Sequence, residues 1–256
     1  MKIVAIIQAR MGSTRLPGKA LIKIADKTVL EHVIRRVQAC RLVNEVVVAT
    51  TVSKGDLPII KLCAEQGISV YCGSEDDVLD RYYQAAKLFK AKTVIRITAD
   101  CPLMDPQVIE TVLRKHIKDR ADYTSNTINE TFPDGEDVEV FSAAALEKAW
   151  IEAKLSSERE HVTAYIRKNP AFFKLAGVEY KTNLKEKRWT LDNQEDLEFV
   201  GKIYSALYQK NNLFSMDDIL EYLAKYPELE QINSHITRNE GYQKSLREDK
   251  IVKERK

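Results

Sequence analysis

Glycines, hydroxyl groups and cationic side chains are concentrated in one short stretch of the chain. Residues 8–19 read Gln-Ala-Arg-Met-Gly-Ser-Thr-Arg-Leu-Pro-Gly-Lys and directly follow an apolar run at positions 3–7. Glycine lets backbone N–H groups approach phosphate oxygens, and Arg and Lys neutralise the phosphate charge. The stretch therefore predicts a strand that delivers a phosphate-binding loop, although a basic surface turn after a core strand has the same composition.

This loop differs from both standard nucleotide-binding patterns. Five residues separate Gly12 from Gly18, and Ala20 follows Lys19 where a Walker loop needs a Mg²⁺-binding Ser or Thr. With only two glycines, the loop also lacks the dinucleotide-binding pattern. We therefore expect the metal ligands to lie elsewhere in the chain.

Two aspartates are the candidate metal ligands. Asp100 ends the apolar run 93–98 and is followed closely by Pro102, while Asp192 follows the short run Trp-Thr-Leu and precedes a helical pattern. Mg²⁺ often takes one or two carboxylates and fills its other positions with substrate phosphates and water. The alternatives are a turn aspartate at Asp100 and a helix cap at Asp192.

Strand-like and helix-like segments alternate before these aspartates and would position them. The strand-like runs are 2–8, 45–50, 68–72 and 93–98, and the helical patterns are 28–40, 57–66, 76–90 and 106–119. This order predicts a Rossmann-like α/β fold of three layers, α/β/α, with a mainly parallel mixed sheet. Ligands of such sheets bind at the carboxyl ends of the strands, so we expect the loop, Ser74 and Asp100 to share one crevice.

The pattern loosens in the second half of the chain. We predict a domain spanning 1–210, in which about 122–187 is an insertion for acceptor and dimer contacts. Residues 211–256 would form a helical extension whose charged tail, 242–256, is solvated or frayed.

Composition narrows the class of protein. The chain has 256 residues with 40 Lys and Arg against 38 Asp and Glu, and a net charge of +2 gives no argument for nucleic-acid or membrane partners. Its four cysteines contain no C-x-x-C pair, and no apolar stretch approaches the roughly 20 residues of a membrane span. These features predict a soluble cytoplasmic protein that binds neither nucleic acid nor membrane.

Six motifs occur in order along the chain, at 6–19, 73–82, 98–102, 133–140, 158–163 and 188–192. Together they resemble the SpsF-type spore-coat polysaccharide cytidylyltransferase-like proteins, within the CMP-Kdo and CMP-sialic acid synthetase superfamily. The resemblance covers about residues 3–200 and implies the nucleotide-diphospho-sugar transferase type of fold. The sequence departs from the usual motif at Ala99, where Gly is common.

The resemblance implies a nucleotide site and a metal site. Arg10, Lys19 and Asp100 would be catalytic, and Asp100 and Asp192 would hold Mg²⁺. The implied nucleotide-binding residues are Gln8, Ala9, Arg10, Gly12, Ser13, Arg15, Lys19, Ser74, Asp80, Arg81 and Thr98.

An acceptor site is implied by the later motifs. Glu136, Asp137 and Glu139 would line it, together with His161 from Glu-Arg-Glu-His. On composition alone the acidic run is a solvated hairpin and His161 is a packed or surface histidine.

The function that follows is transfer of CMP from CTP to a sugar acid or related activated sugar, with release of pyrophosphate, in surface polysaccharide or glycoconjugate synthesis. The partners would be CTP, a small sugar acceptor and a second copy of the chain in a homodimer. Two alternatives are a glycosyltransferase of related fold, which would normally show an Asp-x-Asp motif, and a non-catalytic nucleotide-binding subunit.

Overall fold

A computed structural model describes residues 1–238 and 240–252. Its main sheet has seven strands in the order β5-β4-β1-β6-β8-β7-β9. The strands are β1 (Ile3–Gln8), β4 (Glu45–Thr51), β5 (Ser69–Gly73), β6 (Thr93–Thr98), β7 (Tyr123–Ser125), β8 (Glu139–Ser142) and β9 (Leu175–Gly177). A separate hairpin pairs β2 (Lys23–Ile24) with β3 (Lys27–Thr28).

The first half of the chain forms the parallel part of the sheet. Strand β1 pairs in parallel with β4 on one side and β6 on the other, and β4 pairs in parallel with β5. Residues Val4 to Ile7 are completely buried because helices cover both faces, which explains why β1 is a continuous apolar run. The chain crosses from β5 over to β6, so the carboxyl ends of β1 and β6 lie at the point where the strand order reverses.

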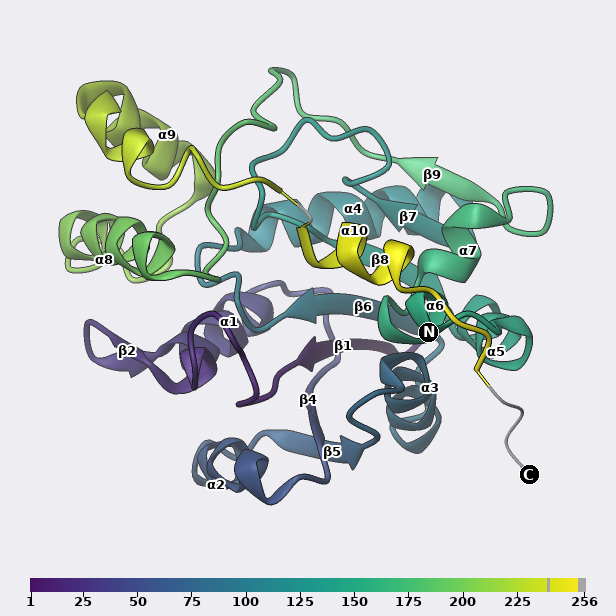
Figure 1. The fold of residues 1–256 in the computed structure, drawn as a ribbon. Helices are drawn as coiled ribbons and strands as arrows, with labels where there is room; N and C mark the ends of the chain where they lie inside the picture. Colours follow the sequence, from purple (N-terminus) through teal and green to yellow (C-terminus); the bar gives the residue numbers. More distant parts are fainter. Residues whose placement is uncertain (239, 253–256) are drawn as a thin grey trace.

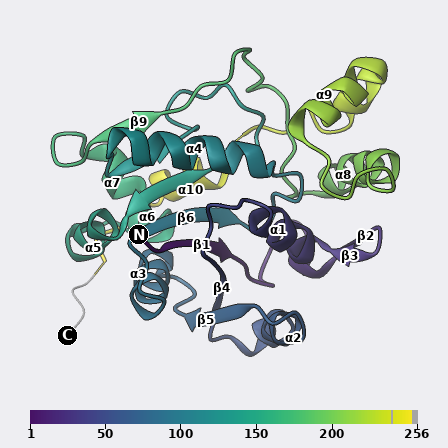
Figure 2. The same ribbon diagram turned by 180° about the vertical axis from the view of Figure 1, so that it is seen from behind.

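Helices cover the two faces of the sheet as two layers (Figures 1 and 2). One apolar cluster packs Ile3, Ala5 and Ile7 against one set of helices, and the other packs Val4 and Ile6 against a second set. The first set is α1 (Val29–Gln38), α2 (Leu57–Glu65), α4 (Pro106–Asp119), α8 (Gln194–Leu207) and α9 (Met216–Lys225); the second includes α3 (Val78–Leu88), α5 (Ala143–Glu152) and α7 (Ala164–Lys168). The predicted three-layer α/β/α fold with a mainly parallel mixed sheet is confirmed.

Segment 122–187 continues the same sheet. Strand β8 pairs antiparallel with β6 and with β7, and β7 pairs in parallel with β9. Within this segment, residues 156–168 form two short helices, α6 (Ser156–Glu160) and α7, because the chain turns between them at Val162 with a φ of 43°. This turn is costly for a β-branched residue. It carries His161 and Thr163 toward Glu139, at the amino-terminal end of β8.

The last part of the chain returns across the front of the sheet. After the turn η3 (Pro227–Ile232), helix α10 (Glu240–Arg247) lies over β6 and β8 and near α6, as its yellow ribbon shows in Figure 1. Beyond it, Asp249 accepts hydrogen bonds from the hydroxyls of Ser156 and Ser157, and the Val252 N–H bonds the Lys154 carbonyl at 2.8 Å. We call residues 240–252 the C-terminal strap. The tail was predicted to be solvated or frayed. Up to Val252 it is ordered by helix α10 and these contacts, although many of its side chains stay exposed; residues 253–256 lie outside the described residues.

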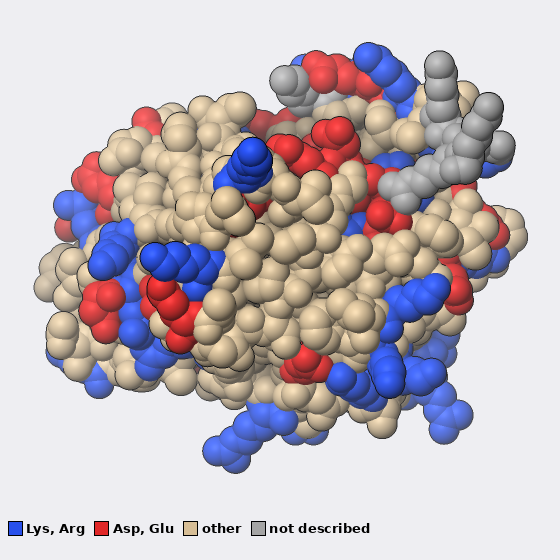
Figure 3. Space-filling model, turned by 90° about the horizontal axis from the view of Figure 1, so that it is seen from below, with Lys and Arg blue, Asp and Glu red and all other residues tan. Residues whose placement is uncertain are grey.

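The surface shows how charge is distributed around this fold. Viewed from the side on which α2 and β5 lie, acidic and basic side chains stand mostly near the margins and the middle of the face is largely uncharged (Figure 3). Among the described residues, none of the helices is long and apolar enough to cross a membrane.

Candidate active site

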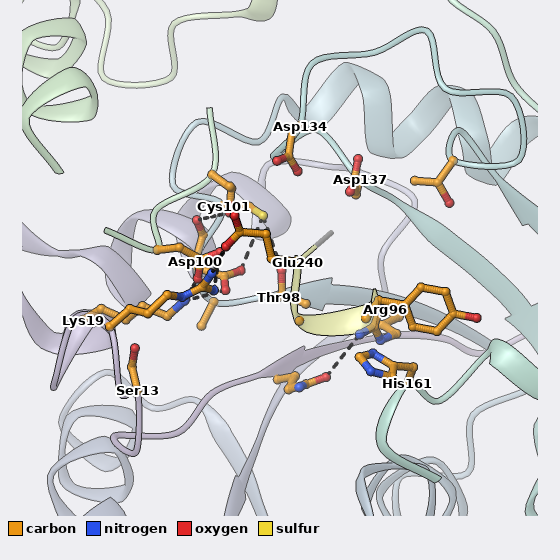
Figure 4. Close-up of a pocket in the computed structure, with 18 of the residues that line it drawn as sticks. Ser13, Lys19, Arg96, Thr98, Asp100, Cys101, Asp134, Asp137, His161 and Glu240 are labelled. Atoms are coloured by element: carbon orange, nitrogen blue, oxygen red, sulfur yellow. Dashed lines mark hydrogen bonds and ion pairs between the residues drawn. The ribbon is translucent and has the colours of Figure 1, made fainter. Parts of the chain in front are cut away.

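A cavity of about 660 Å³ opens at the carboxyl ends of β1 and β6. Lys19 and Asp100 lie toward one end of it, Arg96 and His161 lie toward the other, and Glu240 of the strap lies between them (Figure 4). The predicted site residues that line the cavity are Gln8, Ala9, Arg10, Gly12, Ser13, Arg15, Lys19, Thr98, Asp100, Asp137, Glu139, His161 and Asp192. Segments as far apart in the sequence as Gln8 and Gln243 thus share one site at the carboxyl ends of the parallel strands.

Lys19 joins the two predicted metal ligands. Its Nζ lies 2.7 Å from Asp100 Oδ2 and 2.6 Å from Asp192 Oδ1, and the three side chains are 15%, 25% and 20% exposed. The backbone fixes this placement, since Gly18 takes the left-handed conformation (φ 69°) and starts the short helix η1 (Lys19–Leu21). The two carboxylates therefore converge on one cation.

Mutual neutralisation explains the titration of this cluster. Burial alone would lower the pKa of Lys19, but Asp100 and Asp192 outweigh it and hold that pKa above its usual value. Burial would likewise raise the pKa of Asp100, and the Lys19 ammonium reverses this and lowers the pKa to about 2. Both groups are therefore charged at neutral pH.

Further cations hold Asp192 in place. Arg15 Nη2 lies 2.9 Å from Asp192 Oδ2, and Arg188 Nη2 lies 3.6 Å from the same oxygen. Arg188 is itself fixed by Asp196, which accepts from its Nε and Nη2 at 2.9 Å and also accepts the backbone N–H groups of Asp192 and Asn193. Asp192 is thus positioned by a network of ion pairs and hydrogen bonds, in addition to the start of helix α8 that follows it.

A buried carboxylate fixes the start of the predicted phosphate-binding loop. Asp56 accepts the Met11 N–H at 2.7 Å and the hydroxyls of Thr50 and Thr51 at 3.0 and 2.6 Å. Arg10 stays half-exposed, with Nη1 3.9 Å from Glu75 Oε1. The loop backbone is therefore held while the Arg10 side chain keeps access to solvent.

Three predicted nucleotide-binding residues do not line the cavity. Arg81 is buried and donates from Nη1 to the Ser74 carbonyl at 3.1 Å, and Asp80 accepts from Trp150 Nε1 at 2.8 Å. These contacts tie helix α3 to its neighbours and hold the β5–α3 loop, which carries Glu75, beside Arg10 and Gly12.

The far end of the cavity is an inner chamber lined by Arg96, Glu139, His161, Thr163 and Arg167. Glu139 accepts hydrogen bonds from Arg96 Nη1, from the Thr163 hydroxyl and, at 2.6 Å, from the Tyr123 hydroxyl. Burial would raise the pKa of Glu139, but Arg96 and Arg167 lower it to about 2. The chamber is therefore built on a buried, ionised carboxylate whose oxygens are already hydrogen-bonded.

His161 joins this chamber to the strap. Its Nε2 lies 3.0 Å from Ser245 Oγ, and its ring meets the Tyr242 ring edge-on with centroids 4.8 Å apart. Burial is the main cause that lowers the pKa of His161, so its imidazole is neutral at pH 7.

The acidic run 136–139 divides between cavity and core. Asp137 and Glu139 line the cavity, and Asp137 Oδ1 lies 2.7 Å from Arg238 Nη2. Glu136 lies outside the lining, because its buried carboxylate accepts the Asp105 N–H at 2.8 Å and burial raises its pKa well above the usual value. Its position therefore supports the chain around the site and does not offer a group to a ligand in the cavity.

Sequence reasoning missed several cationic residues of the site. Arg96, Arg167 and Arg188 line the cavity with the predicted groups. Arg96 carried a readable signal, because an arginine between Ile95 and Ile97 in a buried strand needs a charged partner. In residues 1–238 and 240–252, no group of three or more His, Cys, Asp and Glu side chains is arranged to hold a metal ion.

Comparison with known proteins decides what kind of site this is. The sequence matches the family described as Cytidylyltransferase over residues 4–241. The chain belongs to the cytidylyltransferase family. It is 35% identical over 215 residues to the spore coat polysaccharide biosynthesis protein SpsF of Bacillus subtilis, covering 81% of this chain and 87% of that protein.

Two further relatives extend the match. An uncharacterized protein of Methanocaldococcus jannaschii, MJ1063, is 40% identical over 252 residues, which cover 97% of this chain and 99% of that protein. The structure of a cytidylyltransferase from Leptospira borgpetersenii superposes with a TM-score of 0.86 at 33% identity, covering 90% of this chain and 97% of that one. This cytidylyltransferase is thus an enzyme of nucleotidyl transfer, and the match to the M. jannaschii protein extends along nearly the whole chain.

Proposed function

We propose that this cytidylyltransferase transfers CMP from CTP to a hydroxyl group of a sugar acid, with Mg²⁺ as cofactor, in surface polysaccharide or glycoconjugate synthesis. One observation carries the proposal. A single cavity joins two convergent carboxylates and a cationic glycine loop at one end to a chamber with excess positive charge at the other. The first end suits a triphosphate with its metal, and the second suits an anionic acceptor.

The charges of the inner chamber support an acid as the acceptor. Arg96 and Arg167 carry two positive charges against the one negative charge of Glu139, and His161 is neutral. Within the described residues, the Nε atoms of both arginines are buried and lack a hydrogen-bond partner. A carboxylate in this chamber would balance the excess charge, whereas a neutral sugar would leave it unpaired.

The residues at the triphosphate end support the transfer step. The oxygen of the acceptor hydroxyl bonds to the α-phosphorus and releases its proton to water. The bond from that phosphorus to the bridging oxygen breaks at the same time, so that pyrophosphate leaves with the bonding electrons. Arg10, Arg15 and Lys19 line the cavity where the phosphates would lie and would stabilise the charge that collects on their oxygens. Mg²⁺ held by Asp100 and Asp192 would neutralise further phosphate charge. The contact of both carboxylates with the Lys19 ammonium supports their role as ligands of a cation.

The proposal is tested by incubating the protein with CTP, Mg²⁺ and a panel of sugar acids, and by measuring pyrophosphate and the mass of any CMP-sugar. We expect at least one acid to yield a CMP-sugar, and the same sugar with its carboxylate reduced to an alcohol to react far more slowly. Equal rates for the acid and its reduced form would contradict the acid specificity. Transfer of sugar from a supplied nucleotide sugar, without pyrophosphate release from CTP, would show a glycosyltransferase instead.

We also propose that the enzyme is a homodimer. Ile151 and Phe172 are 65% and 63% exposed, and both lie in the segment 122–187 that was predicted to carry dimer contacts. Light scattering behind a sizing column should give about twice the 29.3 kDa mass of the chain, and a monomer mass at micromolar concentration would contradict the proposal.

A further inference from the structure

The Lys19 ammonium lies where a metal bound by both aspartates would have to sit. Each carboxylate directs one oxygen at Nζ, at 2.7 Å from Asp100 and 2.6 Å from Asp192. We propose that Lys19 is a built-in counter-ion that keeps divalent metal out of this two-aspartate site until a nucleoside triphosphate draws the ammonium away. This inference rests on the proposed function, because it assigns the order in which metal and triphosphate occupy that site.

Competition follows from the shared oxygens. An ammonium and a divalent cation both need the same carboxylate oxygens, and they repel each other at contact distance. Arg15 and Arg188 already lie 2.9 and 3.6 Å from Asp192, so the carboxylate pair is surrounded by cations before any metal arrives. A metal ion alone would have to displace Lys19 from both of its ion-pair partners.

A triphosphate changes this balance because it brings the missing anions. Lys19, Arg15 and Arg10 line the same cavity. The Lys19 backbone is fixed by Gly18 and η1, and only the flexible side chain must swing for its ammonium to exchange a carboxylate for a phosphate oxygen. The carboxylates of Asp100 and Asp192 then lack the Lys19 counter-ion, and a divalent metal can take its place.

The two aspartates depend on Lys19 to different degrees. Asp192 also pairs with Arg15 and Arg188, whereas within the described residues Asp100 forms its ion pair with Lys19 alone. Removing the ammonium should therefore create an unpaired, largely buried carboxylate at Asp100 beside a second one. Removing Arg15 should not create an unpaired carboxylate, because Lys19 still contacts both Asp100 and Asp192.

The test measures binding of Mn²⁺ alone, without nucleotide or acceptor, from the electron paramagnetic resonance signal of free Mn²⁺. We expect Lys19→Met to bind Mn²⁺ at least tenfold more tightly than the wild-type protein. Lys19→Arg, which keeps the charge, should stay within about threefold of wild type, and so should the matched control Arg15→Met. Adding Asp100→Asn to Lys19→Met should abolish the gain.

The proposal is overturned if Lys19→Met binds Mn²⁺ no more tightly than Arg15→Met, or if the wild-type protein binds Mn²⁺ as tightly as Lys19→Met. If Lys19→Met folds poorly, its thermal unfolding is followed with and without Mn²⁺. The metal should then raise the unfolding temperature of this variant more than that of wild type, and an equal shift would also overturn the proposal. None of these readouts uses CTP or an acceptor, so failure to find an acceptor would contradict only the proposed function.

Discussion

The two ends of the cavity handle buried charge in different ways. At the end proposed to bind the triphosphate, here called the triphosphate end, Lys19, Arg15 and Arg188 share the aspartates through ion pairs. Arg15 also lies 3.5 Å from Glu240 of the strap. At the inner chamber, the Arg96–Glu139 pair is held by neutral hydroxyl donors from Tyr123 and Thr163.

The difference indicates which end rearranges during the reaction. Ion pairs between flexible, partly exposed side chains can exchange partners at little cost when a triphosphate and metal enter. A buried ion pair fixed by hydroxyl groups cannot exchange partners in this way, because breaking it would leave an unpaired charge in a low-dielectric site. We infer that the triphosphate end is adaptable and that the inner chamber is preorganised.

The largest effect should come from breaking the adaptable end at its central carboxylate. Asp100→Asn keeps the shape of the side chain but removes the charge that would hold the metal, and we expect turnover to fall about 10³-fold, corresponding to about 4 kcal/mol. Initial rates of pyrophosphate release with saturating CTP measure this. Asp26→Asn, on an exposed side chain outside the cavity, is the matched control and should be unchanged. Near-wild-type turnover of Asp100→Asn would contradict the metal assignment.

The inner chamber should respond mainly in stability. Glu139→Gln leaves Arg96 charged and buried without its counter-ion, so we expect the free energy of unfolding to fall by about 3–5 kcal/mol. Tyr123→Phe removes only one neutral donor and should cost about 1–2 kcal/mol. Urea unfolding measures the free energy change for both variants. Asp192→Asn, at the other end of the cavity, is the variant with which they are compared. If Asp192→Asn costs as much as Glu139→Gln, the contrast between the two ends is wrong.

The sequence predicted the parts of this site that depend on local patterns. The strands β1, β4 and β6 were recognisable because both faces of the sheet are covered there and the runs are therefore largely apolar. The edge strand β5 is less buried and was recognisable as a short run after Gly67. The loop cations and the aspartates Asp100 and Asp192 followed from residue type and position at strand ends. The placement of Lys19 between Asp100 and Asp192 did not, because it depends on contacts across 81 and 173 residues.

The remaining differences have the same origin. The sequence of the strap predicts only a charged tail. The contacts that order the strap are with distant residues, such as those of Asp249 with Ser156 and Ser157. Glu136 reads as part of an acidic surface run, and only the fold shows that it is buried against the Asp105 N–H. Local sequence patterns predict the burial of side chains well in helices and strands with a regular periodicity. They predict it poorly in loops that pack on one another.

A smaller effect is expected from the strap, which closes the inner chamber. Tyr242 meets the ring of His161 and lies 5.4 Å from the guanidinium of Arg167, and these contacts are worth about 1–2 kcal/mol together. Tyr242→Ala should therefore raise the KM for the acceptor about five- to tenfold with little change in kcat. Tyr242→Phe keeps the ring and should behave like wild type. An unchanged KM for Tyr242→Ala would show that the strap does not help to hold the acceptor.

The smallest effect concerns Asp137, which lies between the two ends of the cavity. Burial raises the pKa of Asp137 to about 7, and Arg238, which lowers it, only partly offsets burial. In the unfolded chain an aspartate titrates near pH 4, so the folded state resists ionising Asp137 and its contribution to stability is lost as the pH rises from about 4 to about 7.

Because the Asp137 side chain is 33% exposed, solvent screening should limit this loss to about 1 kcal/mol. Asp137→Asn should flatten the fall in unfolding free energy over this pH range, whereas Asp217→Asn, on an exposed residue outside the cavity, should not. Carboxyl NMR titration should place the midpoint of Asp137 above that of an ordinary aspartate, and Arg238→Gln should move it further upward because the attracting guanidinium is gone. A midpoint near 4 in the wild-type protein would mean that Asp137 is solvated in the same way as an ordinary surface aspartate, and that the middle of the cavity carries more negative charge at neutral pH.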